Sequence, residues 1–498
     1  MYLLGYDIGS SSVKAALVNA NTGAVAGIAQ YPSTEMEILA PQPDWAEQHP
    51  ERWWECACAA TRQLLHNTGV SPEHIGGIGI AYQMHGLVCV DKDGAVLRPS
   101  IIWCDSRAVS IGQAAFDAIG TDYCLAHYLN GPGNFTASKL RWVKMHEPAL
   151  FERIHKIMLP GDYMAYRMTG DICTTITGLS EGIFWDFKTN ALAQKLLDHY
   201  EIPEALIPDM VPVFANQGRL NEKAALELGL KPGITVGYRA GDQPNNALSL
   251  NALRPGDVAA TGGTSGVVYA VTDQPRFDPA TRVNSFAHVN YSAQHPLTGV
   301  LLCINGAGIQ YNWMRQYIGG GNALTYNDME KMASNVPIGA EGLQVLPFGN
   351  GAERMLQNHN IGARILQLQF NRHTKPHFYR AALEGIAFSF VYGMDILRDM
   401  DIDLRQLRVG GDNLFRSTIF SKTIATLTNC NIEVIDTTGA IGAAHAAGVA
   451  VGAYRSVEEA LQGGHITATH EPDSGAAPYQ EAYQNWKLAL DQALATAN

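Results

Sequence analysis

Residues 2–18 read YLLGYDIGSSSVKAALV, and this stretch decides the fold. The apolar runs 2–7 and 13–18 are both short enough to be strands. The small polar residues between them cannot continue a strand comfortably, so they predict a tight turn. Another apolar stretch, 24–29, follows a second turn and predicts a third strand. The chain is therefore expected to open with three short strands in succession.

A second copy of this opening pattern lies midway along the chain. The apolar runs 256–260 and 267–271 flank the small-residue turn Gly262-Gly263-Thr264-Ser265-Gly266. No helix-length segment separates the two runs, so they predict a hairpin. A further apolar run, 234–240, precedes the hairpin and ends at Gly241-Asp242. Because small-residue turns are common, the two similar turns do not by themselves establish an internal repeat.

Alternating helices and strands follow each copy and support the repeat. After the first copy, the Trp- and Leu-rich segment that begins at Pro50 has helical spacing and stops at Gly69. An apolar strand is expected at 75–81. The last third predicts helices and strands at 376–398 (helix), 404–409 (strand), 414–427 (helix), 432–435 (strand), 440–454 (helix) and 479–495 (helix). This order predicts two α/β domains with a cleft between them, residues 1–246 and 247–498.

Composition narrows the class of protein. The 498 residues include 35 Lys and Arg against 47 Asp and Glu, a net charge of −12, which disfavours non-specific binding to nucleic acid. No stretch approaches the ~18 consecutive apolar residues of a membrane-spanning helix, and the start lacks the basic region of a secretory signal. The eight cysteines form no C-x-x-C pair and no zinc-type cluster with histidine, so free thiols in a reducing cytoplasm are expected.

Two small-residue turns are candidates for binding a polyphosphate. In DIGSSSVK (7–14), backbone N–H and hydroxyl donors follow a carboxylate at a strand end, and Asp7 can hold Mg²⁺ directly or through water. The turn at 262–266 offers the same donors from the other half of the chain. Two such turns facing each other could grip a phosphate chain from both sides. The alternative for each is a plain hairpin turn, with a solvated Asp7 in the first.

Asp242 is a candidate general base because it directly follows an apolar strand. Transfer of a phosphoryl group to an alcohol needs a group that accepts the hydroxyl proton. The alternative for Asp242 is a helix-capping aspartate. A third small-residue segment, Gly410-Gly411-Asp412-Asn413, stands between a strand and a helix, where it could let a flat ligand approach the backbone. The alternative for that segment is an ordinary turn.

Two polar segments also follow apolar strands. Gln83-Met84-His85-Gly86 and Trp103-Cys104-Asp105-Ser106-Arg107 would emerge where α/β proteins bind ligands. Polar groups beside an aromatic ring suit a polyhydroxylated ligand. The alternatives are a histidine that only satisfies its own hydrogen bonds and a tryptophan that belongs to the core.

Taken in this order, the segments resemble the FGGY carbohydrate kinases, within the superfamily of actin, hexokinase and the Hsp70 ATPase. Segment 7–14 resembles the first phosphate motif of the family, usually D-x-G-T-[ST]-x-x-K, and segment 262–266 resembles the second. Segment 410–413 resembles the start of the adenosine motif, which is more often G-G-G-A. The pair Glu384-Gly385 fits the E-G pair of the family. The similarity runs from about residue 2 to residue 450.

The resemblance implies two ribonuclease-H-like domains, of the actin/hexokinase ATPase type, that close on MgATP and a sugar. Asp242 matches the catalytic base of the family, and Asp7 matches the metal-associated carboxylate. ATP is then expected to contact the phosphate and adenosine motifs at Ser10, Ser11, Ser12, Lys14, Gly263, Thr264, Ser265, Gly410, Gly411 and Asn413. The sugar is expected to contact Met84, His85, Trp103, Asp105, Asp242 and Gln243.

Within the family, QMHG and WCDSR look most like xylulokinases, so the expected reaction is ATP-dependent phosphorylation of D-xylulose to D-xylulose 5-phosphate. Three departures leave another pentulose such as ribulose, a pentitol, glycerol or gluconate open as the acceptor. Gln243 stands where xylulokinases usually have Asn, 349–354 matches the S-G-E-R-T-P loop only loosely, and Thr175 stands where many relatives carry Asp.

Two other classes of protein share some of these motifs. An actin-like or Hsp70-like nucleotide switch has the phosphate turns, but it does not need Asp242 or the polar groups at 84–85 and 103–107. A catalytically silent sugar sensor is the second alternative. The expected partners are the sugar and ATP, with neither nucleic acid nor a membrane, and a homodimer is an allowed assembly.

Overall fold

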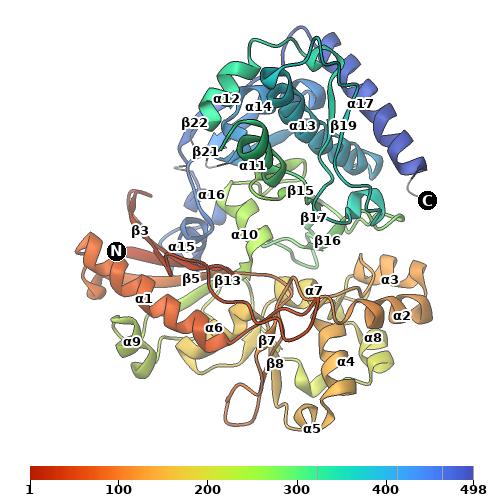
Figure 1. Cartoon of the computed structure of the whole chain (residues 1–498). Helices are drawn as coiled ribbons and strands as arrows, with labels where there is room; N and C mark the ends of the chain where they lie inside the picture. The colour runs from red at the N-terminus through yellow and green to blue at the C-terminus, as the bar shows by residue number, and fades with distance from the viewer. Residues whose placement is uncertain (322–323, 412, 463, 497–498) are drawn as a thin grey trace.

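The computed structural model describes residues 1–321, 324–411, 413–462 and 464–496. Two mixed sheets, one from each half of the chain, organise the molecule (Figure 1). The first sheet has the order β13-β5-β1-β2-β3, in which β1 to β3 are antiparallel and β5 and β13 run parallel to β1. Its strands are β1 (Tyr2–Ile8), β2 (Val13–Asn19), β3 (Val25–Tyr31), β5 (Ile75–Tyr82) and β13 (Thr235–Gly241). The predicted opening of three strands is confirmed.

The second sheet repeats this topology. Its order is β16-β17-β15-β14-β20-β21-β22, and the run β17-β15-β14-β20-β21 matches β3-β2-β1-β5-β13 in order and direction. The strands are β14 (Asp257–Gly262), β15 (Gly266–Thr272), β16 (Asn284–Ala287), β17 (Thr298–Ile304), β20 (Gln406–Gly410), β21 (Ile432–Ile435) and β22 (Ile466–His470). The expected internal repeat and the α/β class are therefore present, with β16 and β22 added at the two edges.

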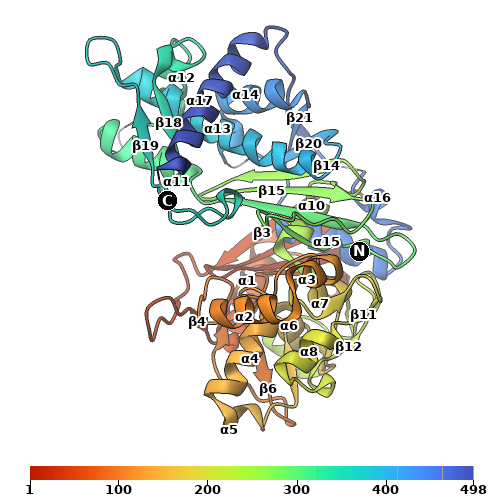
Figure 2. The same ribbon diagram turned by 90° about the vertical axis from the view of Figure 1, so that its right-hand side faces the viewer.

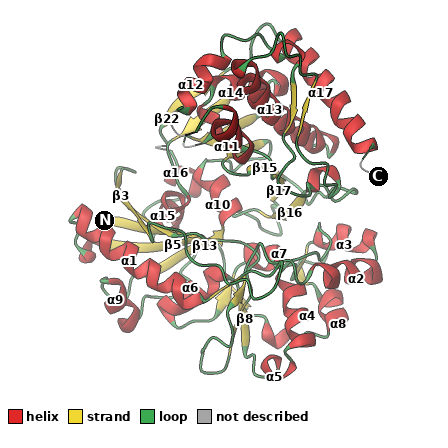
Figure 3. Cartoon of the chain, viewed as in Figure 1, coloured by secondary structure: helices red, strands yellow, loops and turns green. Residues whose placement is uncertain are grey.

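Helices cover both faces of the first sheet (Figures 1 and 3). On one face lie α1 (Pro50–Thr68) and α6 (Pro160–Thr169), and on the other lies α15 (Gly439–Ala450), which belongs to the second half of the chain. The approach of α15 is close because glycines face it: a Cβ on Gly5 would lie 1.9 Å from the Ala440 carbonyl oxygen, and a Cβ on Gly79 would lie 1.9 Å from that of Ala443. Helix and sheet are therefore in backbone contact.

The second sheet is covered by α13 (Lys375–Asp399) and α14 (Thr418–Thr428), and α17 (Ala477–Ala495) packs on these helices (Figure 2). Two predicted helices differ in length from those observed. The helix expected at 414–427 divides into the 3₁₀ turn η6 (Leu414–Arg416) and α14, because the Ser417 hydroxyl accepts a hydrogen bond from the Phe420 N–H and starts a new helix. The helix expected to reach 454 ends at Ala450, before the left-handed Gly452.

Two global expectations concern membranes and cysteines. Within the described ranges, no helix combines the length and hydrophobicity needed to span a bilayer. All eight cysteines are free thiols, as expected.

Candidate active site

The predicted polar segments converge at one edge of the first sheet. Strands β1, β5 and β13 are parallel neighbours, so their carboxyl ends meet there. Asp7 lies near the end of β1, Met84 and His85 follow β5, and Asp242 follows β13 as the first residue of α10 (Asp242–Ser249). The structure therefore brings together four residues that the sequence separates by up to 235 positions.

Asp242 carries a carboxyl group whose pKa is suited to accepting a proton. Burial is the main cause that raises this pKa to about 7, the negative charge of Asp7 adds to the rise, and hydrogen bonds from Gln243 oppose it. The pKa of Asp7 is also raised. Burial is the main cause, and the charge of Lys14, its cross-strand neighbour, opposes the rise. A carboxylate that titrates near neutrality is well matched to general-base chemistry at neutral pH.

His85 is held in one orientation. Its Nδ1 lies 3.0 Å from the Glu181 carbonyl oxygen, which can only accept, so Nδ1 carries the proton and Nε2 retains a lone pair. Burial, and then the charge of Lys139, lower the pKa of His85 to about 3. The backbone of His85 is left-handed (φ 62°), and the Lys139 ammonium group fixes it by donating to the His85 carbonyl oxygen at 2.8 Å. His85 therefore presents a neutral acceptor.

Trp103 and Asp105 differ in their surroundings. Trp103 is 53% exposed, and its indole nitrogen lies 3.3 Å from the Ser10 hydroxyl, which links this loop to the first phosphate turn. Asp105 is fully buried; its carboxylate pairs with Arg107 at 2.7 Å and accepts the Ala46 N–H at 2.6 Å. Asp105 therefore holds the loop that carries Trp103.

The two small-residue turns are both hairpin turns. In the first, the Gly9 N–H donates to the Ser12 carbonyl oxygen at 3.0 Å, and Ser11 is exposed. In the second, which joins β14 to β15, Thr264 and Ser265 are exposed. Helix α10 links this turn to Asp242, because the Asn246 amide lies 3.5 Å from the hydroxyl of Thr261 on β14.

A cavity of about 720 Å³ lies beside the second turn. It is lined by residues that include Gly262, Gly263, Thr264, Tyr311, Tyr326 and Asn413. Tyr311 and Tyr326 stack with ring centroids 5.6 Å apart, and the volume is that of a typical small-molecule site. The predicted residues Gly410 and Gly411 stand at the end of β20 and are not among the residues that line the cavity, whereas Asp412 lies outside the described residues.

The structure adds a buried carboxyl group that the sequence did not reveal. Glu181, the last residue of the short helix α7 (Ile176–Glu181), is 1% exposed, and neither of its carboxyl oxygens has a hydrogen-bond partner among the described residues. A Cβ on Gly241 would lie 2.5 Å from one of these oxygens. Burial, and then the charge of Asp242, raise the pKa of Glu181 well above its usual value. No local motif marks this position.

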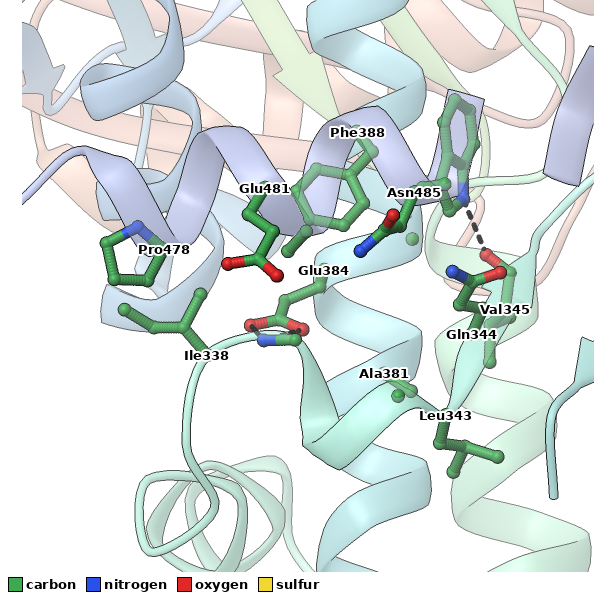
Figure 4. A pocket seen from close by; sticks show the side chains of 15 residues that line it. Ile338, Leu343, Gln344, Val345, Ala381, Glu384, Phe388, Pro478, Glu481 and Asn485 are labelled. Atoms are coloured by element: carbon green, nitrogen blue, oxygen red, sulfur yellow. Dashed lines mark hydrogen bonds between the residues drawn. The ribbon is translucent and has the colours of Figure 1, made fainter. Parts of the chain in front are cut away.

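A second cavity, of about 260 Å³, lies between α13, α17 and residues 338–345 (Figure 4). Glu384, from the predicted E-G pair, lies beside it. Its carboxylate accepts the Gly339 N–H at 3.1 Å and pairs with Arg380 at 2.6 Å. The pair therefore anchors this segment to α13, and no residue predicted to bind ATP or sugar is among those that line this cavity.

We use the term cleft for the boundary between the two halves at this edge, where His85 and Asp242 of the first half approach Phe286 and Cys303 of the second. The rings of His85 and Phe286 have centroids 5.4 Å apart, so the halves are in contact at its rim. The charge of Asp242 acts on the Cys303 thiol across the cleft. Within the described ranges, no group of three or more Asp, Glu, His or Cys side chains forms a metal cluster.

Comparisons with known proteins agree with this architecture. Residues 2–249 match the model of the FGGY family of carbohydrate kinases, N-terminal domain, and residues 258–451 match that of the C-terminal domain. The xylulose kinase of Klebsiella pneumoniae is 28% identical over 477 residues, which is 95% of each chain. The crystal structure of xylulose kinase from Rhodospirillum rubrum superimposes with a TM-score of 0.89, at 26% identity over 99% of each chain.

The fold itself is shared more widely. Gluconate kinase from Lactobacillus acidophilus superimposes with a TM-score of 0.88 at 22% identity, covering 100% of this chain and 99% of that one, which shows likeness of fold alone. The family models span most of the sequence, and the internal repeat explains why two of them match in tandem. The chain therefore belongs to the FGGY family of carbohydrate kinases and is a carbohydrate kinase.

Proposed function

We propose that this kinase transfers the γ-phosphoryl group of MgATP to the terminal hydroxyl of D-xylulose, giving D-xylulose 5-phosphate. The observation that carries the proposal is Asp242, a carboxylate with a pKa of about 7 at the end of β13, beside Met84 and His85. In this assignment Asp242 accepts the proton of the attacking hydroxyl, and Gln243 supports its charged form by hydrogen bonding.

The sugar lies against the first half of the chain in this proposal. His85 offers a neutral Nε2 that accepts a hydrogen bond from a sugar hydroxyl, and Met84 and the exposed ring of Trp103 supply apolar surface. Asp105 contributes indirectly, since its ion pair with Arg107 holds the loop that carries Trp103.

ATP lies between the two phosphate turns. Ser10, Ser11, Ser12 and Lys14 contribute from residues 1–246, which we assign as the sugar-binding domain. Gly263, Thr264 and Ser265 contribute from residues 247–498, which we assign as the nucleotide-binding domain. The 720 Å³ cavity takes the adenosine; Asn413 lines this cavity, and we assign Gly410 and Gly411, which precede Asn413 in the chain, to the same ligand.

Asp7 is the carboxylate assigned to Mg²⁺. Mg²⁺ is commonly held by one or two carboxylates together with substrate phosphates and water, so a single half-buried carboxylate next to a phosphate turn fits this ion. When bound, the ion neutralises charge on the phosphate oxygens. Asp7 also acts without it, because its charge raises the pKa of Asp242.

The choice of D-xylulose rests on the curated relatives, several of which are xylulose kinases that cover most of the chain. Gluconate and glycerol kinases share the fold at lower identity. Gln243 differs from the Asn expected of a xylulokinase, so the acceptor must be tested directly.

The decisive experiment measures ADP release from MgATP in the presence of D-xylulose, D-ribulose, L-ribulose, xylitol, glycerol or gluconate. We expect D-xylulose to give the highest kcat/KM. The variant Asp242→Ala should lose about 10²–10⁴-fold in turnover, whereas the matched control Asp403→Asn, an exposed aspartate, should keep it. A higher kcat/KM with another polyol would replace the substrate, and an active Asp242→Ala would overturn the assignment of the base.

A further inference from the structure

Hydrogen bonds hold a short turn of the second half of the chain at the edge of the cleft. The 3₁₀ turn η5 (Arg354–Leu356) directly follows Glu353, which is fully buried. The carboxylate of Glu353 accepts the backbone N–H of Asn305 at 3.0 Å and that of Gly306 at 3.1 Å, just beyond the end of β17. These contacts fix the position of Arg354 relative to β17.

The end of β17 faces the first domain. Leu301 lies on β17 and belongs to the apolar cluster that also contains Met84 and Phe286, so this side of the strand packs toward the sugar-binding residues. Cys303 lies two positions further along and therefore points the same way. Figure 1 shows β16 and β17 adjacent to α7, and the Ala287 N–H donates to the Ser180 hydroxyl at 2.8 Å.

Arg354 lies in this part of the cleft. Its charge acts on His85, and after burial and Lys139 it is a further cause that lowers the pKa of that ring. Cys303 is exposed, yet the protein around it raises the pKa of its thiol to about 11, and the charge of Arg354 opposes the rise. Arg354 therefore lies within electrostatic reach of groups from both domains.

The guanidinium group of Arg354 makes no hydrogen bond or ion pair in the part of the chain that the structure describes. Burial lowers its pKa, and Cys303 opposes this effect. Arg354 is half-buried, so part of its side chain has lost contact with water without gaining a protein partner, and a ligand rich in oxygen atoms can accept the hydrogen bonds that its N–H groups offer. Of the residues that we assign to the sugar, His85 lies within reach of the charge of Arg354.

We propose that Arg354 is a sugar ligand supplied by the second domain, with its guanidinium group donating hydrogen bonds to hydroxyl or carbonyl oxygens of the acceptor. This inference rests on the proposed function. The planar fork of arginine suits two neighbouring oxygen atoms of one polyol. Because His85 and Asp242 belong to the other domain, a sugar bound in this way contacts both domains and favours the closed cleft.

The test compares Arg354→Ala and Arg354→Lys with the wild type. The matched control is Arg405→Ala, since Arg405 is exposed and pairs only with Asp403. Calorimetry gives the dissociation constants for D-xylulose and for MgADP, and ADP release gives KM and kcat. If another polyol of the panel is preferred by the wild type, that polyol replaces D-xylulose. Thermal unfolding reports whether each variant is folded.

We expect Arg354→Ala to lower kcat/KM for the sugar about 10- to 100-fold, mainly through KM, as hydrogen bonds to a charged group predict. Arg354→Lys should lose less kcat/KM than Arg354→Ala, because lysine keeps the positive charge but lacks the planar N–H groups of the guanidinium. The dissociation constant for the sugar should rise with KM, while that for MgADP should change much less. Arg405→Ala should match the wild type.

Three results would overturn the inference. If sugar binding is unchanged in Arg354→Ala, the residue is not a sugar ligand, and the proposed function still stands. If binding of MgADP weakens as much as binding of the sugar in both Arg354 variants, the residue serves the phosphate groups or the fold. A wild type that phosphorylates no polyol of the panel would refute the proposed function itself, and this inference with it.

Discussion

The pH dependence of the reaction follows from the environment of Asp242. The base must be ionised to accept the hydroxyl proton, so activity should be lost as pH falls through the pKa of this residue. That pKa is about 7 because burial and the charge of Asp7 outweigh the hydrogen bonds from Gln243. The ionised fraction is then about one tenth at pH 6 and about nine tenths at pH 8, so kcat/KM for the sugar should rise about tenfold over this interval.

The variant Gln243→Met tests in which direction the pH profile moves when a hydrogen bond to Asp242 is removed. Met has a similar length but no hydrogen-bond donor, so the charged form of Asp242 loses the side-chain hydrogen bond that now lowers its pKa. The acidic limb of the pH profile should move to higher pH. The matched control is Gln194→Met, because Gln194 is exposed on α8 (Gln194–Tyr200) and its amide contacts only Asp198.

Initial rates of ADP release, with saturating MgATP and limiting sugar, report kcat/KM at each pH. A profile that is flat between pH 6 and pH 8 would show that no group with a pKa near 7 controls the reaction. A limb that moves to lower pH in Gln243→Met would show that Gln243 does not stabilise the ionised base. Either result would refute the reasoning, whatever the preferred sugar.

Three further predictions concern residues that support the site. In Lys139→Met the His85 carbonyl oxygen loses its hydrogen bond, so KM for the sugar should rise about tenfold; an unchanged KM in the ADP assay would contradict this. In Glu353→Ala two backbone N–H groups lose their acceptor, which should lower the free energy of unfolding by about 1–3 kcal/mol in urea titrations. In Gly5→Ala the new Cβ meets the Ala440 carbonyl oxygen at 1.9 Å, so the same titration should show a loss of about 1–3 kcal/mol or more, and wild-type stability would disprove the close contact.

The sequence predicts those parts of the molecule that local patterns encode. The strand that ends near Asp7 and the one that ends before Asp242 are short apolar runs followed by polar turns, so both the strands and their polar ends could be placed. Parallel pairing then brings the two ends together, which requires only the topology of a β-sheet.

The residues that were missed come from elements with no such pattern. Glu181 is the last residue of a six-residue helix, Lys139 is one of several charged residues on the helix α4 (Thr136–His146), and Arg354 begins a single 3₁₀ turn in a loop that matches the family pattern only loosely. Each reaches the site through packing between segments distant in sequence. Strand β22 was missed because it is short and has only two apolar residues, Ile466 and Ala468, both of which are exposed.

Helix α15 has a consequence for how the chain is made. The apolar side chains of Leu3, Ala16 and Val18 pack in one cluster with Ala440 and Ala444, residues that leave the ribosome more than 400 positions later. Until then, one face of the earliest sheet lacks its cover, and exposed apolar surface of this kind favours aggregation. The nascent chain must be protected through most of its synthesis, and a fragment that stops at Ser249 would expose that face permanently. The first sheet is therefore completed only after the residues of α15 have been made.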